Sequence, residues 1–355
     1  MFLERIQLTQ FKNHGSSSYD FGKRINCVLG NNGKGKTNIL DSIYYLSFTK
    51  SAVGSQDRLS VQHEMSSFTI HGSYDECVLA IQFQKGKTKT LKIDGKEPDK
   101  LSDVIGKVPL VIVLPDDTAM INEGSEERRK FFDGALSQFD SEYLQNLLSY
   151  NKLLKQRNSL LKQNDGRSLN YQLIETYDDQ LIPLAIQISK RRRELKELFL
   201  PFLKKNYAEL HEAGESPDLN FKTQVDEGFE SMFRNNFQRD QIMQRTLLGS
   251  HKDDFEFVLD GELIKKFGSQ GQQKTFIIAL KLALYDFLKD KKQQKPLLLL
   301  DDIFDKLDDS RIEMLVSLLL DENRFGQIFI TDARKDRSKE LFKGKKEVNF
   351  IEIAD

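Results

Sequence analysis

Residues 30–37 read GNNGKGKT and contain the side chains and glycines of a phosphate-binding loop. They match G-x-x-x-x-G-K-[ST], follow an apolar strand pattern and precede a helical one, which is the context this loop requires. Glycines let successive backbone N–H groups point at phosphate oxygens, and the positive end of the following helix faces the same anion. We expect Lys36 to bridge the β- and γ-phosphates of a nucleotide and the Thr37 hydroxyl to ligate Mg²⁺. The loop residues are Gly30, Asn31, Asn32, Gly33, Lys34, Gly35, Lys36 and Thr37.

Two carboxylates form a second chemical group. Asp301 and Asp302 directly follow the apolar run PLLLL, and adjacent carboxylates at the end of a buried strand are costly unless a cation or hydrogen bonds compensate them. The arrangement is typical of a Walker B strand. We expect Asp301 to bind the Mg²⁺ shell and Asp302 to orient or deprotonate the attacking water, with Lys36 as the third catalytic group. An acidic helix cap is the alternative interpretation.

A second candidate anion site lies between these motifs, in FGSQGQQKTF at 267–276. Ser269 and Gly271 offer a hydroxyl and free N–H groups at the start of a long helix, and Gln272 follows them. One nucleotide does not need two such phosphate-binding segments within one subunit. The economical geometry is therefore a head-to-tail homodimer in which each Ser269–Gln272 segment closes on the γ-phosphate held by the partner's loop.

The elements that position these groups alternate along the chain. Residues 1–124 read mainly as strands with one helix at 37–48, and residues 125–212 show helical periodicity with high charge. Residues 213–355 return to alternating strands and helices, in which LLLL and IFIT are continuous apolar runs typical of central parallel strands. We predict an α/β domain built from 1–124 and 213–355, with an antiparallel helical lobe inserted at 125–212.

Composition restricts the functional class. The chain has 53 Lys plus Arg against 54 Asp plus Glu, so nucleic-acid binding would need locally segregated charge, as in the lysines at 85, 87, 89 and 92 or in Arg191–Arg193. A solvated surface is the alternative for both clusters. The start of the chain lacks a secretory pattern, and no apolar run reaches the roughly 18 residues needed to span a bilayer. We expect a cytoplasmic protein with no membrane partner, and we interpret Cys27 and Cys77 as reduced core residues.

The motif set resembles the ATP-binding cassette class, and specifically its DNA-repair branch that includes SMC proteins. The motifs are GNNGKGKT, SQGQQ, LLLLDD and KLDDSR. Further stretches are similar to the RecF family of bacterial recombination mediators. These are the opening F-L-x-x-I-x-L-x-x-F-K-N, PDDTAMINEGSEERRKFFD, YNKLLKQRN, GSHKDDF and PLLLLDDIFDKLDDSR, which together span nearly the whole chain.

The resemblance implies a P-loop ATPase head of the ABC type that uses ATP and Mg²⁺. It implies that ATP closes a homodimer on DNA at single-stranded gaps or single/double-strand junctions, and that a weak DNA-stimulated hydrolysis releases it. It further implies a role in DNA repair, recombination, replication-fork recovery and the SOS response, with RecR/RecO-type mediator proteins as partners.

Some positions depart from the family's pattern. Glu123 and Ser125 stand where RecF proteins usually have glycine and proline, and residues 249–252 read GSHK instead of GPHR. Thr331–Asp332 stand where transporter-type cassettes place a histidine near the γ-phosphate, and Asp116–Asp117 replace a glutamine. We therefore expect slow hydrolysis.

Three other functions fit the sequence less well. A transporter's nucleotide-binding subunit shares the loop and the Walker B strand but not SQGQ or the basic helical insert. A purely structural SMC-like clamp needs longer helices than this insert, which we expect Pro183 and Pro201 to bend or end. A nuclease would need a metal cluster for which His251, Asp253 and Asp254 are the one candidate, and we interpret these three as structural or interfacial.

Overall fold

The computed structural model of the 355-residue chain describes all residues except 55, 163–169, 212–213, 307 and 354–355. It contains two compact units: Met1–Asp117 with Glu209–Glu212 and Lys274–Asp355, and Thr118–Ala208 with Ala213–Gln273. The second unit is larger than the predicted lobe, because the strands within residues 217–263 pair with one another and not with strands of the first unit. The predicted boundary at 212–213 and Leu307 of the last motif lie outside the described residues.

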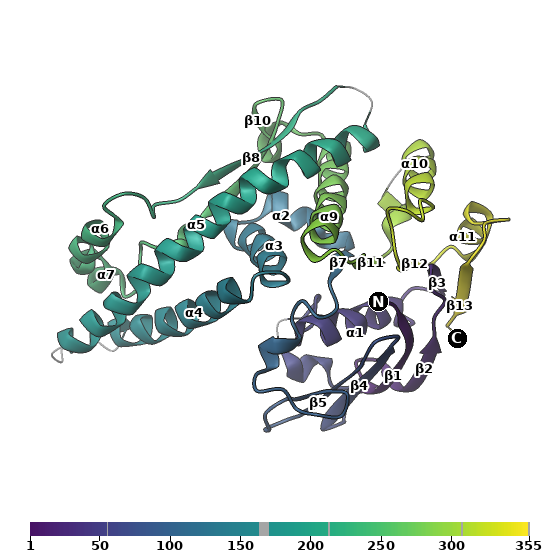
Figure 1. Ribbon diagram of the computed structural model, residues 1–355, viewed down its shortest axis with the longest axis horizontal. Helices are drawn as coiled ribbons and strands as arrows, with labels where there is room; N and C mark the ends of the chain where they lie inside the picture. The colour runs from purple at the N-terminus through teal and green to yellow at the C-terminus, as the bar shows by residue number, and fades with distance from the viewer. Residues whose placement is uncertain (55, 163–169, 212–213, 307, 354–355) are drawn as a thin grey trace. The chain divides into compact units, whose positions relative to one another are not determined.

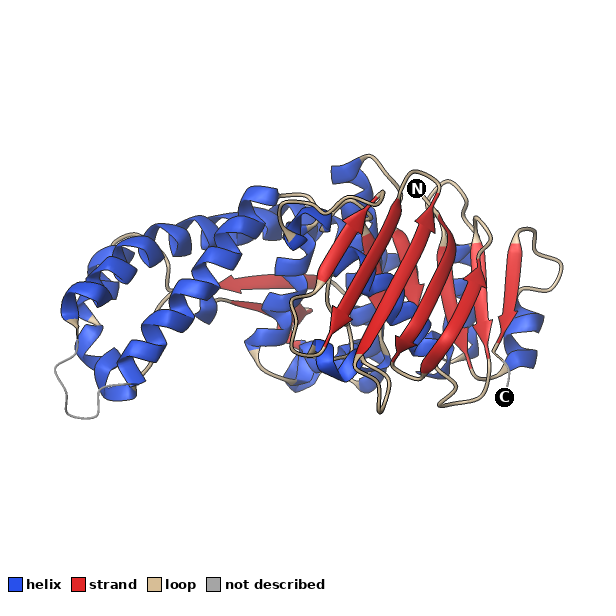
Figure 2. Ribbon diagram, turned by 90° about the horizontal axis from the view of Figure 1, so that it is seen from below, coloured by secondary structure: helices blue, strands red, loops and turns tan. Residues whose placement is uncertain are grey.

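An antiparallel sheet forms one layer of the first unit (Figure 2). Its order is β2-β1-β4-β5-β6, with β1 (Leu3–Phe11), β2 (His14–Asp20), β4 (Ser67–Tyr74), β5 (Val78–Gln84) and β6 (Thr90–Ile93). Every second residue of β4 is buried, as expected for a sheet with one face on the core. The sequence predicts all of these strands except β2, whose HGSSSYD lacks an apolar alternation.

A parallel sheet forms the other layer, in the order β13-β3-β12-β11-β7. Its strands are β3 (Ile25–Leu29), β7 (Leu110–Val113), β11 (Leu297–Leu300), β12 (Ile328–Asp332) and β13 (Val348–Glu352). All four pairings are parallel, and every residue of β11 and β12 is buried. The prediction of central parallel strands is confirmed.

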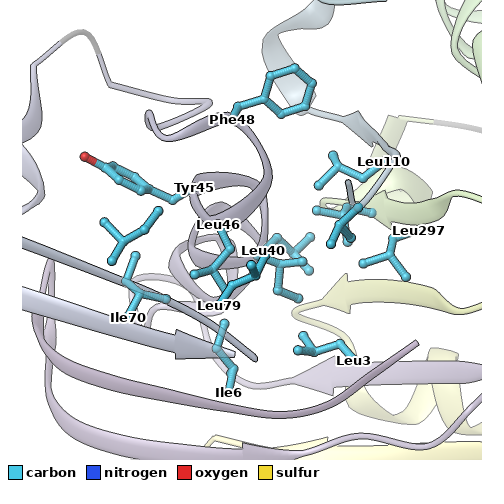
Figure 3. Packing of buried hydrophobic residues seen from close by; sticks show 14 of the residues in the cluster. Leu3, Ile6, Leu40, Tyr45, Leu46, Phe48, Ile70, Leu79, Leu110 and Leu297 are labelled. Carbon is cyan, nitrogen blue, oxygen red and sulfur yellow. The ribbon is translucent and has the colours of Figure 1, made fainter. Parts of the chain in front are cut away.

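Helix α1 (Lys36–Phe48) packs against strands of both sheets. Figure 3 shows Leu40 and Leu46 of this helix among leucine and isoleucine side chains from both sheets. Leu3, Ile6, Ile70 and Leu79 come from the antiparallel sheet, and Leu110 and Leu297 come from the parallel sheet. The helix that follows the glycine-rich loop is thus the centre of the unit's hydrophobic core.

The other helices of the first unit include α9, which begins in the second unit. They are η1 (Asp57–Ser60), η2 (Leu101–Val104), η3 (Pro115–Thr118), α9 (Gln270–Lys292), η5 (Ile303–Lys306), α10 (Asp309–Leu319) and α11 (Lys335–Leu341). Asp308 caps α10 by accepting a hydrogen bond from the Arg311 backbone N–H. None of the described helices has both the length and the apolar composition needed to span a membrane.

The second unit combines helices with a small antiparallel sheet of order β10-β9-β8. Its strands are β8 (Pro217–Lys222), β9 (Asp254–Leu259) and β10 (Glu262–Leu263). Its helices are α2 (Ala119–Asn122), α3 (Ser125–Ser137), α4 (Ser141–Lys162), α5 (Tyr171–Leu210), α6 (Phe229–Asn235), α7 (Phe237–Met243), η4 (Ser250–Lys252) and α8 (Ile264–Phe267). Strand β9 packs against α3, and this contact joins the sheet to the helices.

Helices α4 and α5 lie side by side and antiparallel, as predicted (Figure 1). Two contacts define the direction: Asn146 Nδ2 donates to Gln187 Oε1 at 2.8 Å, and Arg157 Nε donates to Asp178 Oδ1 at 2.6 Å. Neither Pro183 nor Pro201 ends α5, which runs for 40 residues. A proline removes one backbone donor. The buried face of α5 continues past both prolines, through Leu181, Ala185, Ile188, Leu195, Phe199 and Leu203, and offsets that loss.

A buried ion cluster fixes these helices to α7. Arg157 is fully buried; its guanidinium donates to Asp178, to Asp240 Oδ2 at 2.7 Å and to Thr246 Oγ1 at 2.8 Å. Burial raises the pKa of Asp178, and the charge of Arg157 opposes this rise. Removal of the cation would leave two buried carboxylates without compensation.

We predict that Arg157→Met lowers the free energy of unfolding by about 3–5 kcal/mol. The matched control is Arg193→Met, because Arg193 pairs with Asp226 while 49% exposed, and such pairs contribute about 1 kcal/mol or less. Urea unfolding of the full chain, followed by circular dichroism, measures both. Equal stabilities of the two variants would contradict the assigned role of Arg157.

Candidate nucleotide-binding site

Three neighbouring strands of the parallel sheet carry the candidate residues at their carboxyl ends. Strand β3 leads into the loop 30–35, β11 ends before Asp301 and Asp302, and β12 ends in Thr331 and Asp332. The sheet order places β12 between β3 and β11. Carboxyl ends of parallel strands lie at one edge of a sheet, where α/β proteins bind ligands.

The loop is folded around the ammonium group of Lys36. This side chain is 4% exposed, and its Nζ donates to the carbonyl oxygens of Gly30 at 2.9 Å and Asn31 at 3.1 Å. Gly33 and Gly35 have φ angles of 81° and 96°, a conformation that L-residues rarely adopt. Gly35 is also the N-cap of α1 and supplies no side-chain acceptor, so the first N–H groups of the helix are suited to an anionic ligand.

Hydroxyl and carboxylate groups join the loop to the two following strands. Thr37 Oγ1 donates to the Asp301 carboxylate, 3.0 and 2.9 Å from its two oxygens. Thr331 Oγ1 donates to Asp301 Oδ1 at 2.7 Å and accepts from the backbone N–H of Asp302 at 2.9 Å. The structure therefore brings together four predicted site residues, Lys36, Thr37, Asp301 and Asp302.

The carboxylate of Asp302 is incompletely compensated. Its Oδ1 is buried and has no hydrogen-bond partner among the described residues, and its backbone adopts a φ of 44°. Burial, followed by the negative charge of Asp301, raises its pKa. The pKa of Asp301 is also raised by burial, against the hydrogen bonds from Thr331 and Thr37. An orphaned buried oxygen beside a strained backbone is typical of a functional site.

The donor set fits Mg²⁺. Thr37 and Asp301 present oxygen ligands within 3.0 Å of each other, and hard cations prefer oxygen. The described residues contain no cluster of three or more His, Cys, Asp or Glu side chains suited to a metal. Magnesium at nucleotide sites needs no such cage, because one or two carboxylates and the substrate phosphates hold it.

The turn between β1 and β2 supports the loop, a role that the sequence did not reveal. Asn13 Nδ2 donates to the Gly33 carbonyl at 3.4 Å, and His14 Nε2 lies 3.2 Å from the Gly35 carbonyl oxygen. Asn38 Nδ2 donates to Asn13 Oδ1 at 2.6 Å. A Cβ atom on Gly35 would lie 2.6–2.8 Å from Asn13 and His14 atoms. The one available signal was the F-K-N motif at the start of the chain.

Residues 331–332, at the switch-histidine position of transporter-type cassettes, and residues 116–117, at the glutamine position, differ in their contacts. The Asp332 carboxylate is buried and accepts hydrogen bonds from Arg337, so it serves the fold. Asp117 accepts from the Leu114 N–H and pairs with Lys281 at 2.9 Å, while Asp116 is exposed. Of these positions, Thr331 is the residue that contacts the Walker B carboxylate.

The SQGQ segment belongs to the second unit and forms a capping box at the start of α9. Ser269 Oγ accepts from the Gln272 N–H at 3.2 Å, and Gln272 Oε1 accepts from the Ser269 N–H at 2.7 Å. Gln272 Nε2 donates to Glu215 at 2.8 Å. The hydroxyl proton of Ser269 can still be donated, and the anion-binding role of Ser269, Gly271 and Gln272 stays a prediction.

The candidate nuclease residues are held by neighbouring side chains. His251 Nδ1 lies 2.7 Å from a tyrosine hydroxyl, and its Nε2 lies 3.1 Å from a backbone carbonyl oxygen. Asp253 is fully buried and pairs with Arg192, and Asp254 makes a two-bond pair with Arg128. Burial lowers the pKa of His251 to about 4. These contacts support the structural interpretation.

We expected the Arg191–Arg193 run to be either a phosphate-binding cluster or a solvated surface, and Arg192 is neither. This residue is 2% exposed and pairs with Asp133 and Asp253 at 2.9 Å. The exposed Arg193 pairs with Asp226 at 2.5 Å, and Arg191 pairs with acidic side chains as well. The sequence shows the charge run but not the carboxylates that the fold places around it.

The lysine cluster at 85–96 is only partly available. Lys89 pairs with Asp57 at 2.8 Å, and Lys85 donates to a backbone carbonyl. Lys87 and Lys92 are exposed. These two side chains are accessible to a polyanion.

Comparison with known proteins identifies relatives that match nearly the whole chain. The family described as "RecF/RecN/SMC N terminal domain" matches residues 2–349. A "DNA replication and repair protein RecF" of Cytophaga hutchinsonii is 43% identical over 347 residues, 96% of this chain and 92% of the relative. The protein of the same name from Flavobacterium johnsoniae is 39% identical and covers 97% of both chains.

Solved structures also match this chain. The chain is similar to the "recombination mediator protein RecF-ATPrS in RecFOR pathway", with a TM-score of 0.87, 27% identity, and coverage of 99% of this chain and 96% of that one. An SMC head bound to the C-terminal winged-helix domain of ScpA matches at a TM-score of 0.52 and 15% identity, with coverage of 94% and 90%. The second similarity shows the fold alone. Together they confirm the predicted α/β ATPase-head fold with a helical insertion.

Two glycines of the loop provide a matched test of its support. Both have positive φ, so alanine costs roughly 1–2 kcal/mol of strain at either position. A Cβ on Gly33 meets nothing within 4 Å, whereas on Gly35 it collides with Asn13 and His14. We predict that Gly35→Ala weakens ATP binding at least about tenfold more than Gly33→Ala, which corresponds to about 1.4 kcal/mol. Titration with fluorescent ATP measures this; equal affinities would exclude the proposed support by the β1–β2 turn.

Proposed function

Because this chain belongs to the RecF family of DNA replication and repair proteins, we propose that it binds ATP with Mg²⁺ in the site formed by Gly30–Thr37, Asp301 and Asp302. One observation carries the proposal: the Thr37–Asp301 contact lies beside the buried oxygen of Asp302, which has no partner among the described residues, at the edge of the sheet where the glycine-rich loop leads into α1. The names of related structures, RecF-ATP and RecF-ATPrS, are consistent with it.

The residues divide the chemistry among them. Lys36, already held by loop carbonyls, would exchange these for the β- and γ-phosphate oxygens. Thr37 and Asp301 would hold Mg²⁺, which when bound supplies positive charge to the phosphates. Asp302 would orient the attacking water and accept its proton, with its backbone fixed by Thr331. Thr331 offers no imidazole at the switch position, and we infer slow, DNA-stimulated hydrolysis.

We predict that Asp302→Asn retains ATP affinity and lowers the hydrolysis rate about 10²- to 10⁴-fold, because the amide cannot accept the proton. Asp116→Asn is the control, since this carboxylate is exposed and should be dispensable. Phosphate release and ATP titration separate the two effects. Normal hydrolysis by Asp302→Asn would assign the water to another residue.

We propose that ATP binding closes a head-to-tail homodimer on DNA with single-stranded gaps or junctions. Each partner's Ser269 would donate its hydroxyl proton to the γ-phosphate of the other subunit while its oxygen still accepts from Gln272. In this proposal the protein works in the cytoplasm as a recombination mediator with RecR/RecO-type partners. Its processes would be DNA repair, replication-fork recovery and the SOS response, and hydrolysis would release the DNA.

Mixing of two inactive variants tests the shared site. Ser269→Arg should bind ATP without closing over it, and Lys36→Met should lose its phosphate contact. In an equal mixture half of the dimers are heterodimers with one intact site, so about a quarter of the wild-type ATPase should return. Recovery also shows that both chains are folded.

A non-complementing pair is the control for this experiment. Lys36→Met and Asp302→Asn both damage the subunit's own half of the site, so their heterodimer contains no intact site and should stay inactive. Wild-type hydrolysis by Ser269→Arg alone would show that SQGQ is only a helix start.

A further inference from the structure

Three cations of the second unit converge without a carboxylate partner in the described part of the chain. Arg129 lies on α3, Arg245 follows α7, and Lys252 ends η4. The Arg129 guanidinium donates to neutral acceptors, the Ser125 hydroxyl and the Asp253 carbonyl, both at 2.6 Å. Arg245 and Lys252 are exposed, and within the described residues neither belongs to an ion pair.

The backbone brings these three segments together. Arg129 binds the carbonyl of the residue that follows Lys252. On the other side, His251 Nε2 lies 3.1 Å from the carbonyl oxygen of Thr246, the residue that follows Arg245. Lys252 is therefore held between the arginines by contacts of its own neighbours.

Helix α4 also contacts this segment, through two of its side chains. Asn158 Oδ1 accepts from the backbone N–H of Thr246 at 2.7 Å, and the Tyr150 hydroxyl lies 2.7 Å from His251 Nδ1. Gly249 approaches so closely that a Cβ there would lie 2.4 Å from the Tyr150 oxygen. The cations thus extend from a rigid base, which reduces the entropy lost when they hold a ligand.

Positive charges act on Lys252, whereas Arg129 also has the carboxylates of Asp133, Asp253 and Asp254 near it. The pKa of Lys252 is lowered by burial and then by the positive charges of Arg245 and Arg129. The carboxylates closest in sequence already have other partners. These pairs are Asp133 and Asp253 with Arg192, Asp254 with Arg128, Glu126 and Glu127 with Lys130, and Asp240 with Arg157. An anion placed among the three cations would replace repulsion by attraction.

We infer that Arg129, Arg245 and Lys252 form a binding site for the phosphodiester groups of DNA. The inference rests on the proposed function, in which the protein acts on DNA. Lysine and arginine contacts to phosphate fix the position of a protein on DNA without reading its sequence. Such a role suits a mediator that recognises a DNA structure, and it assigns DNA contacts to a surface that the charge runs in the sequence did not indicate.

The test compares two double variants of the full-length protein. Arg245→Gln with Lys252→Gln removes two exposed cations that pair with no carboxylate in the described part of the chain. Arg193→Gln with Arg234→Gln removes two exposed cations that are already paired, with Asp226 in one case and with Asp179 and Glu230 in the other. The net charge falls by two in both. Binding of a fluorescent gapped duplex is measured with ATP and Mg²⁺ at several salt concentrations.

Each lost phosphate contact lowers the slope of log affinity against log salt by about 0.9, which is about eightfold in affinity at 0.1 M salt. The Arg245/Lys252 variant should therefore bind about sixtyfold more weakly there and lose about 1.8 units of slope, while the control keeps both values. The charge-preserving Lys252→Arg should bind as the wild type does. ATP titration and thermal melting confirm that each variant is folded.

The outcomes separate this inference from the proposed function. If the wild type binds DNA with ATP and both double variants match it, the inference is overturned and the proposed function stands. If the Arg193/Arg234 variant loses as much affinity as the other, the effect is net charge and no site exists. If the wild type does not bind DNA, both fail.

Discussion

The first unit depends on the hydrogen bonds that the buried carboxylate of Asp301 accepts. This carboxylate accepts hydrogen bonds from Thr37 on α1 and from Thr331 at the end of β12, so one charge joins the ends of three strands. A buried charge is tolerated only when such partners surround it. Its partner helix α1 also fills the space between two sheets, where Leu40 lies in the core. The geometry of the site and the packing of the fold are therefore set by the same helix.

The antiparallel sheet contributes to the site as well as to the core. The turn between its first two strands places Asn13 and His14 against the glycine-rich loop. Lys12, next to them, pairs at 2.7 Å with Asp41, a fully buried carboxylate on α1. Truncating one partner of such a pair leaves an uncompensated charge. The loop is thus held by polar contacts from the β1–β2 turn, and Gly35 gives the start of α1 no side-chain cap.

The sequence predicts what depends on local pattern and misses what depends on distant partners. The loop, the Walker B carboxylates and the parallel strands follow from spacing and apolar runs, and the structure assembles them. Strand β2 was missed because its serines pair with β1 through the backbone alone. Arg192 looked exposed in an arginine run, but Asp133 and Asp253 come from elements 59 and 61 residues away. Such separations cannot be read from one-dimensional periodicity.

The capping box at Ser269 and Gln272 has an evolutionary consequence. Its reciprocal hydrogen bonds begin α9, whose following residues are largely buried. Loss of such a cap costs about 1 kcal/mol whether or not any ligand is bound. Purifying selection on folding therefore acts on the same atoms that are proposed to face the γ-phosphate. Descendants that lost ATP turnover should retain serine and glutamine here, while the glycine between them, which the cap does not use, becomes free to drift.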